Sequence, residues 1–349
     1  MNYRVLFSTK DLPILQNKMF PDRESAIRCP RGDVSLVQNE TYGFIFNQLF
    51  DKTLIAYDTD YQNEQAFSKV FRGHLEDVTK IISQHFSGKS LLEVGCGKGY
   101  FLELLQRAGF EIIGIDPAYE GINPKIIKDH FKPSLNISTD GIILRHTLEH
   151  IPDPISFLSA IAQANGNKGI IYIEVPCFDW ICNHKAWTDI FYEHVNYFRL
   201  ADFQRIFSKI YDSGHIFGGQ YLYIIADINS LRYPSVNHKT DFTFPDDFLS
   251  NLSQIATIAK GHRNTIWGGA AKGVIFAHYM HKMDVKIGSV IDINPAKQGK
   301  FIAGTGIKVS SPDEGINRLT PGDILFVMNP NYLEEIKMLT NNQFNYTVV

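Results

Sequence analysis

Ser90-Leu91-Leu92-Glu93-Val94-Gly95-Cys96-Gly97-Lys98-Gly99 joins a short apolar run to an acidic residue and three alternating glycines. A run of this length closed by glycines predicts a buried strand that turns sharply toward a helix. The helical spacing of Phe101, Leu104 and Leu105 continues the pattern directly after the loop. Because glycine has no Cβ and tolerates positive φ, the backbone of such a loop can approach a bulky ligand closely. The stretch therefore predicts a strand, a ligand-binding turn and a helix.

Similar strands and helices recur on both sides of this unit. A helical period precedes it from Phe71 to Ile82, and further strands are expected at 111–115, 141–144 and 169–175. This alternation is typical of a parallel, doubly wound α/β sheet. A second α/β alternation is expected near the C-terminus, with strands at 264–267, 289–293 and 323–328 and helices from about 272 and at 332–339.

The chain is long enough for more than one hydrophobic core. Single cores rarely grow beyond about 250 residues, and this chain has 349. Changes in composition predict a small N-terminal module at 1–62, a central α/β core at 63–235 and a C-terminal α/β domain at 236–349. The first part is rich in turn formers and is expected to be irregular and poor in strands. Residues 231–248, rich in Pro, Asn, Ser, Thr and Asp, are expected to form a surface connector.

Charge and hydropathy exclude several classes of protein. The 34 basic and 37 acidic side chains give a net charge of −3, so the chain offers no broad positive field to a nucleic-acid backbone. No window approaches the roughly 20 apolar residues of a membrane span, and no export signal is evident. The four cysteines form no C-x-x-C pair, which argues against disulfides and against a self-contained zinc site. We expect a cytoplasmic protein with a small-molecule substrate; nothing in the sequence decides its oligomeric state.

The glycine spacing indicates which ligand the first loop binds. A dinucleotide-binding loop leaves two residues between its second and third glycines, whereas one residue separates Gly97 and Gly99. Asp116 follows the next expected strand, where a carboxylate can accept hydrogen bonds from both hydroxyls of a ribose. An ordinary glycine turn is the alternative. The form E-x-G-x-G-x-G resembles the first motif of class I methyltransferases, which implies S-adenosylmethionine as cofactor and these candidate contacts: Glu93, Gly95, Cys96, Gly97, Gly99, Asp116, Pro117, Arg145 and His146.

A second polar cluster, at 145–154, follows the expected strand at 141–144 and so belongs to the same edge of the sheet. His146, Glu149 and His150 do not reproduce the H-E-x-x-H spacing, so we expect no metal there. His146 fits a helix cap or a packing contact equally well. His150 is the stronger candidate for a contact with a ligand.

A third cluster, Tyr192-Glu193-His194, follows an aromatic-rich insertion after the expected strand at 169–175. It offers a proton donor, a carboxylate and a base that titrates near neutrality. If this loop folds across the pocket, His194 can take a proton while Tyr192 stabilises the charge that develops. The alternative is the start of a helix in which the aromatic residues pack in the core and His194 is buried and neutral.

Together, in this order, the motifs resemble the sugar C-methyltransferase family, which acts on deoxysugars attached to a nucleoside diphosphate. The resemblance rests on residues 93–99, 146–154, 192–198 and 267–273 and spans nearly the whole chain. It implies a small N-terminal zinc module, a methyltransferase core and a C-terminal Rossmann-like domain. It also implies a catalytic base at His194, sugar contacts at Tyr192 and His150, and a closing tyrosine at Tyr61 or Tyr57.

The N-terminal module departs from this family. Relatives carry a C-x-x-C pair before the position of Gly43, where this chain has Asn39-Glu40-Thr41-Tyr42. These side chains cannot replace the thiolates of a tetrahedral zinc site. We therefore expect the module to lack zinc and to be held by apolar contacts among Leu12, Ile14, Leu15, Phe44, Ile45 and Phe46.

The C-terminal turn at 268–273 and the reaction itself each leave alternatives open. The turn opens a helix after a strand, so its amides and Lys272 could hold an anion such as a nucleotide diphosphate. Close packing of strand against helix explains its glycines equally well. An O-methyltransferase acting on a sugar or a glycan precursor would use the same donor loop without a ketone, and an inactive binding module would show no turnover.

Overall fold

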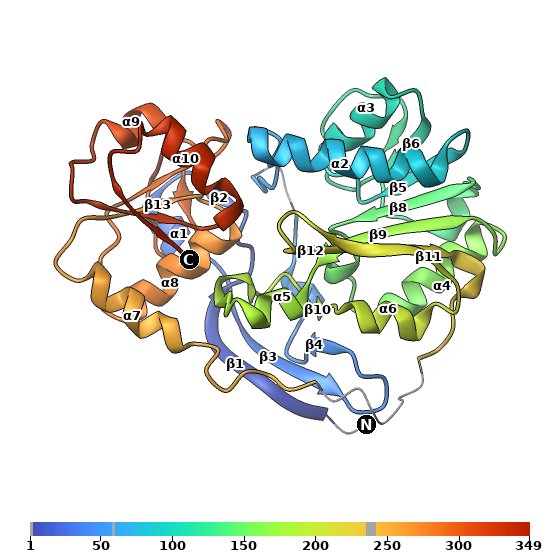
Figure 1. Cartoon of the computed structure of the whole chain (residues 1–349), viewed down its shortest axis with the longest axis horizontal. Coiled ribbons are helices and arrows are strands. Elements are labelled where there is room, and N and C mark those ends of the chain that lie inside the picture. Colours follow the sequence, from blue (N-terminus) through green and yellow to red (C-terminus); the bar gives the residue numbers. More distant parts are fainter. Residues whose placement is uncertain (1–2, 58–59, 235–241) are drawn as a thin grey trace.

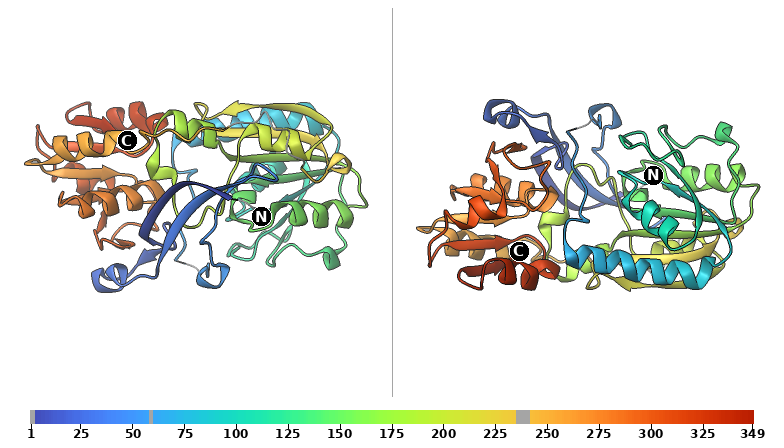
Figure 2. Two further views of the ribbon diagram at one scale, coloured as in Figure 1. Left: turned by 90° about the horizontal axis from the view of Figure 1, so that it is seen from below. Right: turned by 90° about the horizontal axis from the view of Figure 1, so that it is seen from above.

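A computed structural model describes residues 3–57, 60–234 and 242–349. Within these residues the chain forms a 4-stranded N-terminal sheet, a 7-stranded central sheet and a 5-stranded C-terminal sheet. The central and C-terminal units lie side by side, and the N-terminal strands run beneath both (Figure 1). Two further views show these blue strands crossing between the two units (Figure 2). The N-terminal sheet thus bridges the two larger parts.

The central sheet confirms the predicted doubly wound α/β fold. Its strand order is β11-β12-β9-β8-β5-β6-β7, and the five strands from β9 to β7 are parallel. Leu91 packs with α2 and α3 while Leu92 packs with α4, so the sheet is covered on both faces (Figure 1). The elements are β5 (Ser90–Val94), β6 (Glu111–Ile115), β7 (Ile126–Ile127), β8 (Gly141–Arg145), β9 (Ile170–Pro176), β11 (Ile210–Ile216), β12 (Tyr221–Asp227), α2 (Lys69–Phe86), α3 (Tyr100–Arg107), α4 (Pro154–Ala164), α5 (Phe178–Asn183) and α6 (Leu200–Ile206).

Strands β11 and β12 were not expected from the sequence. Strand β12 adds to β9 in antiparallel orientation, and β11 adds antiparallel to β12 at the edge of the sheet. Most of β11 is only half buried and its sequence, Ile-Tyr-Asp-Ser-Gly-His-Ile, lacks an apolar alternation. Its pairing with β12, rather than a local pattern, makes this segment a strand.

The N-terminal module corrects the expectation of a strand-poor segment. Strand β1 (Tyr3–Pro13) pairs antiparallel with β3 (Arg31–Asn39), and β4 (Ile45–Asn47) joins β3 to the distant β10 (Asn196–Tyr197). The register pairs Tyr3 with Asn39. Much of β1 faces solvent, so its sequence carries polar residues where a buried strand would carry apolar ones. Because the paired strands lie far apart in the sequence, no short stretch of residues predicts their pairing.

The core of this module is apolar. Leu12, Ile14 and Ile45 are buried, with Leu15 and Phe44 packed against the same cluster. Phe46 makes an edge contact with the ring of Tyr3, at a centroid distance of 5.6 Å. These contacts agree with the expected apolar packing, and the absence of zinc stays a prediction.

The C-terminal unit is a parallel α/β sheet with the order β16-β14-β13-β17-β18. The strands expected near 264, 289 and 323 and both expected helices are present. Strand β15 pairs with β2 of the N-terminal module, so the two parts share a ribbon. The elements are β13 (Asn264–Trp267), β14 (Ser289–Ile291), β15 (Phe301–Ile302), β16 (Val309–Ser310), β17 (Ile324–Val327), β18 (Asn345–Val348), α7 (Ser250–Ala259), α8 (Ala271–Lys282), α9 (Pro312–Ile316), α10 (Leu333–Leu339), and β2 (Met19–Phe20) and α1 (Arg23–Ile27) of the N-terminal module.

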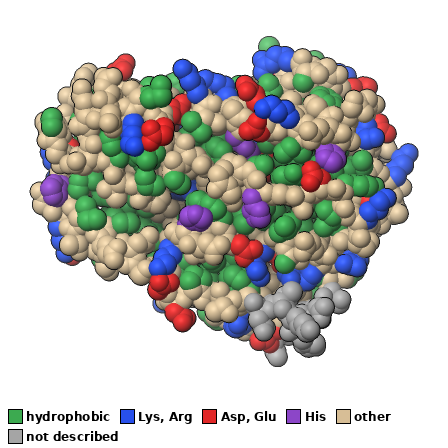
Figure 3. Space-filling model, viewed as in Figure 1, with side chains coloured by type: hydrophobic (Ala, Val, Ile, Leu, Met, Phe, Trp, Pro, Cys, Tyr) green, Lys and Arg blue, Asp and Glu red, His purple; other side chains and the backbone are tan. Residues whose placement is uncertain are grey.

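The predicted domain boundaries, after 62 and after 235, stay predictions. The second boundary falls at residue 235, and residues 235–241 of the expected connector lie outside the residues that the structure describes. Among the described residues no helix is both long and apolar enough to span a membrane. Acidic and basic side chains are interspersed over the face shown in Figure 3, which displays no continuous basic patch.

Candidate active site

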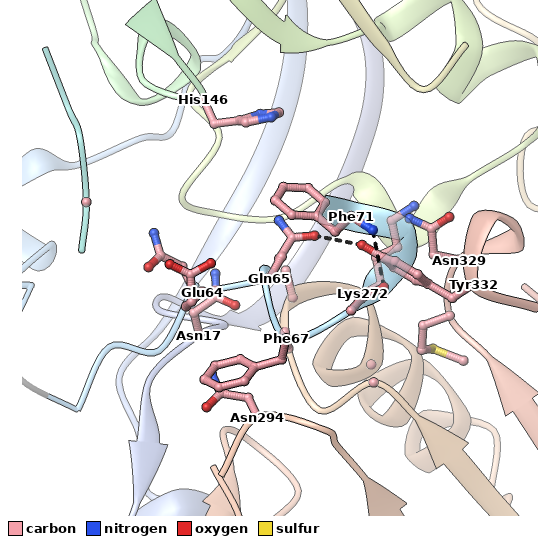
Figure 4. Close-up of a pocket in the computed structure, with 18 of the residues that line it drawn as sticks. Asn17, Glu64, Gln65, Phe67, Phe71, His146, Lys272, Asn294, Asn329 and Tyr332 are labelled. Carbon is pink, nitrogen blue, oxygen red and sulfur yellow. Dashed lines mark hydrogen bonds between the residues drawn. The ribbon is translucent and has the colours of Figure 1, made fainter. Parts of the chain in front are cut away.

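A cavity of about 360 Å³ opens between the central and C-terminal units, at the carboxyl ends of the parallel strands. Its wall includes Tyr61 from the N-terminal part, His146 and His194 from the central part, and Lys272 and Asn294 from the C-terminal part. The close-up shows His146 across the cavity from Asn294 (Figure 4). Residues from all three predicted parts therefore meet at one site.

The glycine loop after β5 is shaped by close contacts. Gly95 has φ +81°, and a Cβ at this position would lie 2.1 Å from Oγ1 of Thr147. The amide of Gly97 donates to Oδ2 of Asp116 at 2.8 Å, which ties the loop to the end of β6. Gly99, with φ +84°, is the N-cap of α3. Only glycine satisfies both the conformation and the space at position 95.

Glu93 and Arg145 form the inner wall beside this loop. Glu93 is 2% exposed, and its Oε2 has no hydrogen-bond partner among the described residues. Burial raises the pKa of Glu93 to about 7, although the charge of Arg145 acts in the opposite direction. The guanidinium of Arg145 lies 4.3 Å from the ring centroid of Phe101. A buried carboxylate with a free oxygen at a cavity wall is suited to a donor group on a ligand.

Not every predicted cofactor residue lines the cavity. Cys96 and Gly97 do, together with Glu93, Gly95, Arg145 and His146. Asp116, Gly99 and Pro117 do not belong to the wall, and both carboxylate oxygens of Asp116 accept backbone amides, from Gly97 and Ala118. In this structure Asp116 therefore braces the loop.

A buried charge cluster lies behind Arg145. Glu174 on β9 is fully buried and accepts hydrogen bonds from Arg145 at 3.0 Å and from His146 and His74, each at 3.0 Å. The hydroxyl of Tyr172 donates to it at 2.8 Å. Burial alone would raise the pKa of Glu174, but Arg145 and the two histidines hold it well below its usual range. His146 itself adopts φ +48°.

Replacing Glu174 with Gln is expected to lower the free energy of unfolding by about 3–5 kcal/mol, because Arg145 would lose its buried counter-charge. Denaturant unfolding followed by circular dichroism measures the change. The matched control is Glu111→Gln, which alters an exposed glutamate on β6 of the same sheet and is expected to stay within about 0.5 kcal/mol of the original. Equal stability of the two variants would contradict the prediction.

His150 and His194 face each other at the other end of the wall. Their ring centroids lie 5.0 Å apart, and Nδ1 of His150 is 2.9 Å from the carbonyl oxygen of Glu193. The amide of Val195 donates to the carbonyl of Glu149 at 2.9 Å, which joins the two loops. Burial holds the pKa of His194 well below its usual value, and His150 and His146 add to this effect. His194 is therefore neutral and able to accept a proton.

The loop carrying His194 is not a helix start. It lies in a turn between a 3-10 helix, η4 (Trp187–Asp189), and strand β10. The amide of Asn47 on β4 donates to the carbonyl of Val195 at 2.8 Å. The N-terminal sheet therefore holds this loop across the pocket, as the acid/base hypothesis requires.

Tyr61 lies beside this pair. Its hydroxyl donates to Oε2 of Glu193 at 2.7 Å and accepts from Asn17 at 3.2 Å. Glu193 also accepts the amide of Gln16 at 2.7 Å, so both carboxylate oxygens are engaged. Of the two tyrosines considered, Tyr61 lines the cavity, and Tyr57 packs on its ring at 4.8 Å.

Tyr192 does not reach the cavity, which corrects its expected position. The side chain is 1% exposed and packs into the N-terminal module, where its ring lies against the backbone of Gly32. Its hydroxyl accepts the amide of Asp51 at 2.8 Å and donates to the carbonyl of Leu49 at 3.4 Å. Tyr192 lies in a turn and His194 directly follows it, so no regular strand alternation fixes their side-chain directions, and closeness in sequence does not place both at the pocket.

Among the residues that the structure describes, two sets of side chains are close enough to share a metal ion. His74, His146 and Glu174 form one, and their mutual hydrogen bonds account for it fully. In the second set, atoms of Glu149, His150 and His194 all lie within 4.8 Å of one another. The expectation that no metal binds here stays a prediction.

On the C-terminal side of the cavity, a glycine amide is bound by an aspartate in the same way as in the first loop. The amide of Gly269 donates to Oδ2 of Asp292 at 2.8 Å, as Gly97 does to Asp116. Nζ of Lys272 lies 2.7 Å from Asp189, and the buried side-chain amide nitrogen of Asn294 has no hydrogen-bond partner in the described part of the chain. A free buried donor beside a helix N-terminus suits an anionic or polar ligand.

Sequence reasoning did not select three of the acidic residues at this site. Glu174 was hidden within an apolar strand, and Asp189 within an aromatic insertion. Glu149 was weighed only as part of a metal motif. An ionisable residue inside an otherwise apolar strand is a usable signal, because burial without a partner is costly.

Comparison with known proteins assigns the class. Residues 63–210 match a family model described as a methyltransferase domain, and residues 242–345 match one described as a C-methyltransferase C-terminal domain. The chain is an S-adenosyl-L-methionine-dependent methyltransferase, and the glycine loop with its unpaired Glu93 fits that methyl donor. More particularly, it joins a methyltransferase domain to a C-methyltransferase C-terminal domain.

Two relatives are themselves methyltransferases by name. The chain is 24% identical over 293 residues to the C-methyltransferase NovU of Streptomyces niveus, covering 71% of this chain and 68% of NovU. It is 29% identical over 121 residues to the human mitochondrial ubiquinone biosynthesis O-methyltransferase, covering 28% of this chain and 33% of that protein. A Thermotoga maritima methyltransferase structure, 14% identical, aligns over 45% of this chain and 91% of its own with a TM-score of 0.34, too low to support any argument.

Proposed function

We propose that the protein methylates a carbon next to the ketone of a nucleotide-linked 4-keto deoxysugar, a precursor of a polysaccharide or other glycoside. The observation that supports this best is the neutral His194, held beside His150 in the same cavity as the donor loop. The motif resemblance and the match to NovU point the same way. We further propose the domain boundaries given above.

Carbon becomes nucleophilic only when its proton leaves. In the proposed reaction, a ring nitrogen of His194 takes the proton beside the ketone, and the C–H electron pair forms an enolate. The enolate carbon then bonds to the methyl group while the carbon–sulfur bond of the donor breaks. S-adenosyl-L-methionine supplies an electrophilic methyl group bound to sulfur, so the protein's main contribution is alignment. His194 afterwards returns its proton to solvent.

The other residues have distinct proposed roles. Glu93 and the amides around Gly97 hold the methionine portion of the donor, because the free oxygen of Glu93 can accept from its ammonium group. His150 and Tyr61 contact the sugar from opposite elements of the wall. The C-terminal turn and Asn294 hold the nucleotide diphosphate, since the turn opens α8 and the side-chain amide of Asn294 has no partner among the described residues.

The test is a product analysis. Purified protein is incubated with labelled donor and a panel of nucleoside-diphosphate 4-keto-6-deoxysugars, and products are examined by mass spectrometry and carbon NMR. We expect one added methyl group on a ring carbon. A methyl ether would instead establish an O-methyltransferase, and donor binding without any product would indicate an inactive binding module.

A further inference from the structure

Glu149 is an unusual residue for the wall of this cavity. It is 1% exposed, and neither carboxylate oxygen accepts a hydrogen bond from any residue that the structure describes. An unsatisfied buried carboxylate opposes folding, so its retention calls for a nearby positive charge or a functional reason. The rest of the wall supplies both.

The positive charge is at His146. Its Nε2 lies 3.0 Å from Oε1 of Glu174, and its Nδ1 lies 3.5 Å from Oε1 of Glu149. Because each ring nitrogen faces a carboxylate, each carries a proton, and the ring is an imidazolium. The carboxylate of Glu149 therefore has a cation beside it in a buried setting.

The functional reason is that the carboxylate also lies close to two histidines of the cavity wall. An oxygen of Glu149 lies within 4.8 Å of a ring nitrogen of His194 and of one of His150. The backbone fixes this approach, because Val195 donates to the carbonyl of Glu149 at 2.9 Å. The next acidic residue, Glu193, is already engaged by Tyr61 and Gln16.

Proton removal places a positive charge on His194 in a setting that opposes it. The ring is half buried, its ring centroid lies 5.0 Å from that of His150, and burial, His150 and His146 all lower its pKa. Glu149 supplies the opposite charge at close range. We propose that Glu149 is a positioning residue whose carboxylate supports His194 as it takes the substrate proton; this inference rests on the proposed function.

The experiment compares Glu149→Gln, Glu149→Asp and the control Glu103→Gln in the full-length protein. Glu103 is an exposed glutamate on α3, away from the cavity. With the best substrate of the 4-keto panel, Glu149→Gln is expected to lower kcat by roughly 10- to 100-fold, as removal of an opposite charge at this range implies. KM and the Kd for the donor should change by less than about twofold, since neither ligand loses a contact.

The conservative variant separates charge from shape. Glu149→Asp retains the charge and should recover part of the lost kcat, whereas Glu103→Gln should match the original protein. The proposal is overturned if Glu149→Gln keeps its kcat, or if Glu149→Asp is as slow as Glu149→Gln while melting at the original temperature. It is also overturned if a chelator abolishes turnover and a divalent ion restores it, because Glu149, His150 and His194 would then hold that ion.

Failure of this inference differs from failure of the proposed function. If His194→Ala is inactive while Glu149→Gln is fully active, only the proposed role of Glu149 is contradicted. If no panel member is methylated, or if His194→Ala retains its turnover, the proposed reaction falls and the role of Glu149 falls with it.

Discussion

His194→Ala is expected to lower kcat by roughly 100- to 10,000-fold, the range supplied by a general base, while binding of the methyl donor is unchanged. The imidazole lines the cavity beside His150, and the donor loop lies on other elements of the wall. Removal of the ring therefore takes away the proton acceptor without touching the loop. Steady-state kinetics measure turnover, and calorimetry measures the Kd for the donor and for its demethylated product.

The matched control is His215→Ala. His215 is an exposed histidine on edge strand β11 and does not line the cavity, so the same chemical change occurs outside the wall. Its kcat and Kd should equal those of the original protein. Full activity in His194→Ala would remove this residue from the mechanism, and loss of donor binding would show that the variant had disturbed the site as a whole.

Gly95→Ala is expected to weaken donor binding by at least about 30-fold. The new Cβ would lie 2.1 Å from Oγ1 of Thr147, and the backbone would keep φ +81°. Overpacking costs about 1–3 kcal/mol, and a strained backbone conformation costs a similar amount. Relief requires the loop to move, which displaces the amides that face the ligand. Calorimetry with S-adenosyl-L-methionine measures the change in Kd.

Two further variants separate strain from collision. Gly109→Ala introduces the same methyl group at φ +91° but with no heavy atom within 4 Å. This variant therefore has backbone strain without a collision, and it should bind the donor normally. Adding Thr147→Ala to Gly95→Ala removes the colliding oxygen and should recover part of the affinity. Normal donor binding by Gly95→Ala alone would show that the loop does not need its close approach.

The sequence predicted the positions of His150 and His194 in the pocket wall more successfully than that of Tyr192. Each histidine follows the carboxyl end of a parallel strand, and such ends meet at one edge of the sheet. Tyr192 was grouped with His194 because the two are close in sequence. The turn sends their side chains in different directions, and Gly32 and Asp51 of the N-terminal module enclose the tyrosine.

The N-terminal module shows the same limit at the level of the fold. Its turn-rich sequence predicted an irregular segment, yet β1 and β3 form a long antiparallel pair. Cross-strand contacts between distant residues stabilise this pair, and half-exposed strands need no strict apolar alternation. The sheet matters for function, because β4 pairs with β10 and so fixes the loop that carries His194.

The sequence by itself determined the donor loop and the two α/β units. A strand, a glycine turn and a helix follow from neighbouring residues, since burial periodicity and backbone freedom are local properties. Only the tertiary structure decided that Glu149 faces His194, that Glu174 supports His146, and that Tyr61 closes the wall. These contacts join segments far apart in the chain, and their charges are stable in a buried site only because the partners arrive from different elements.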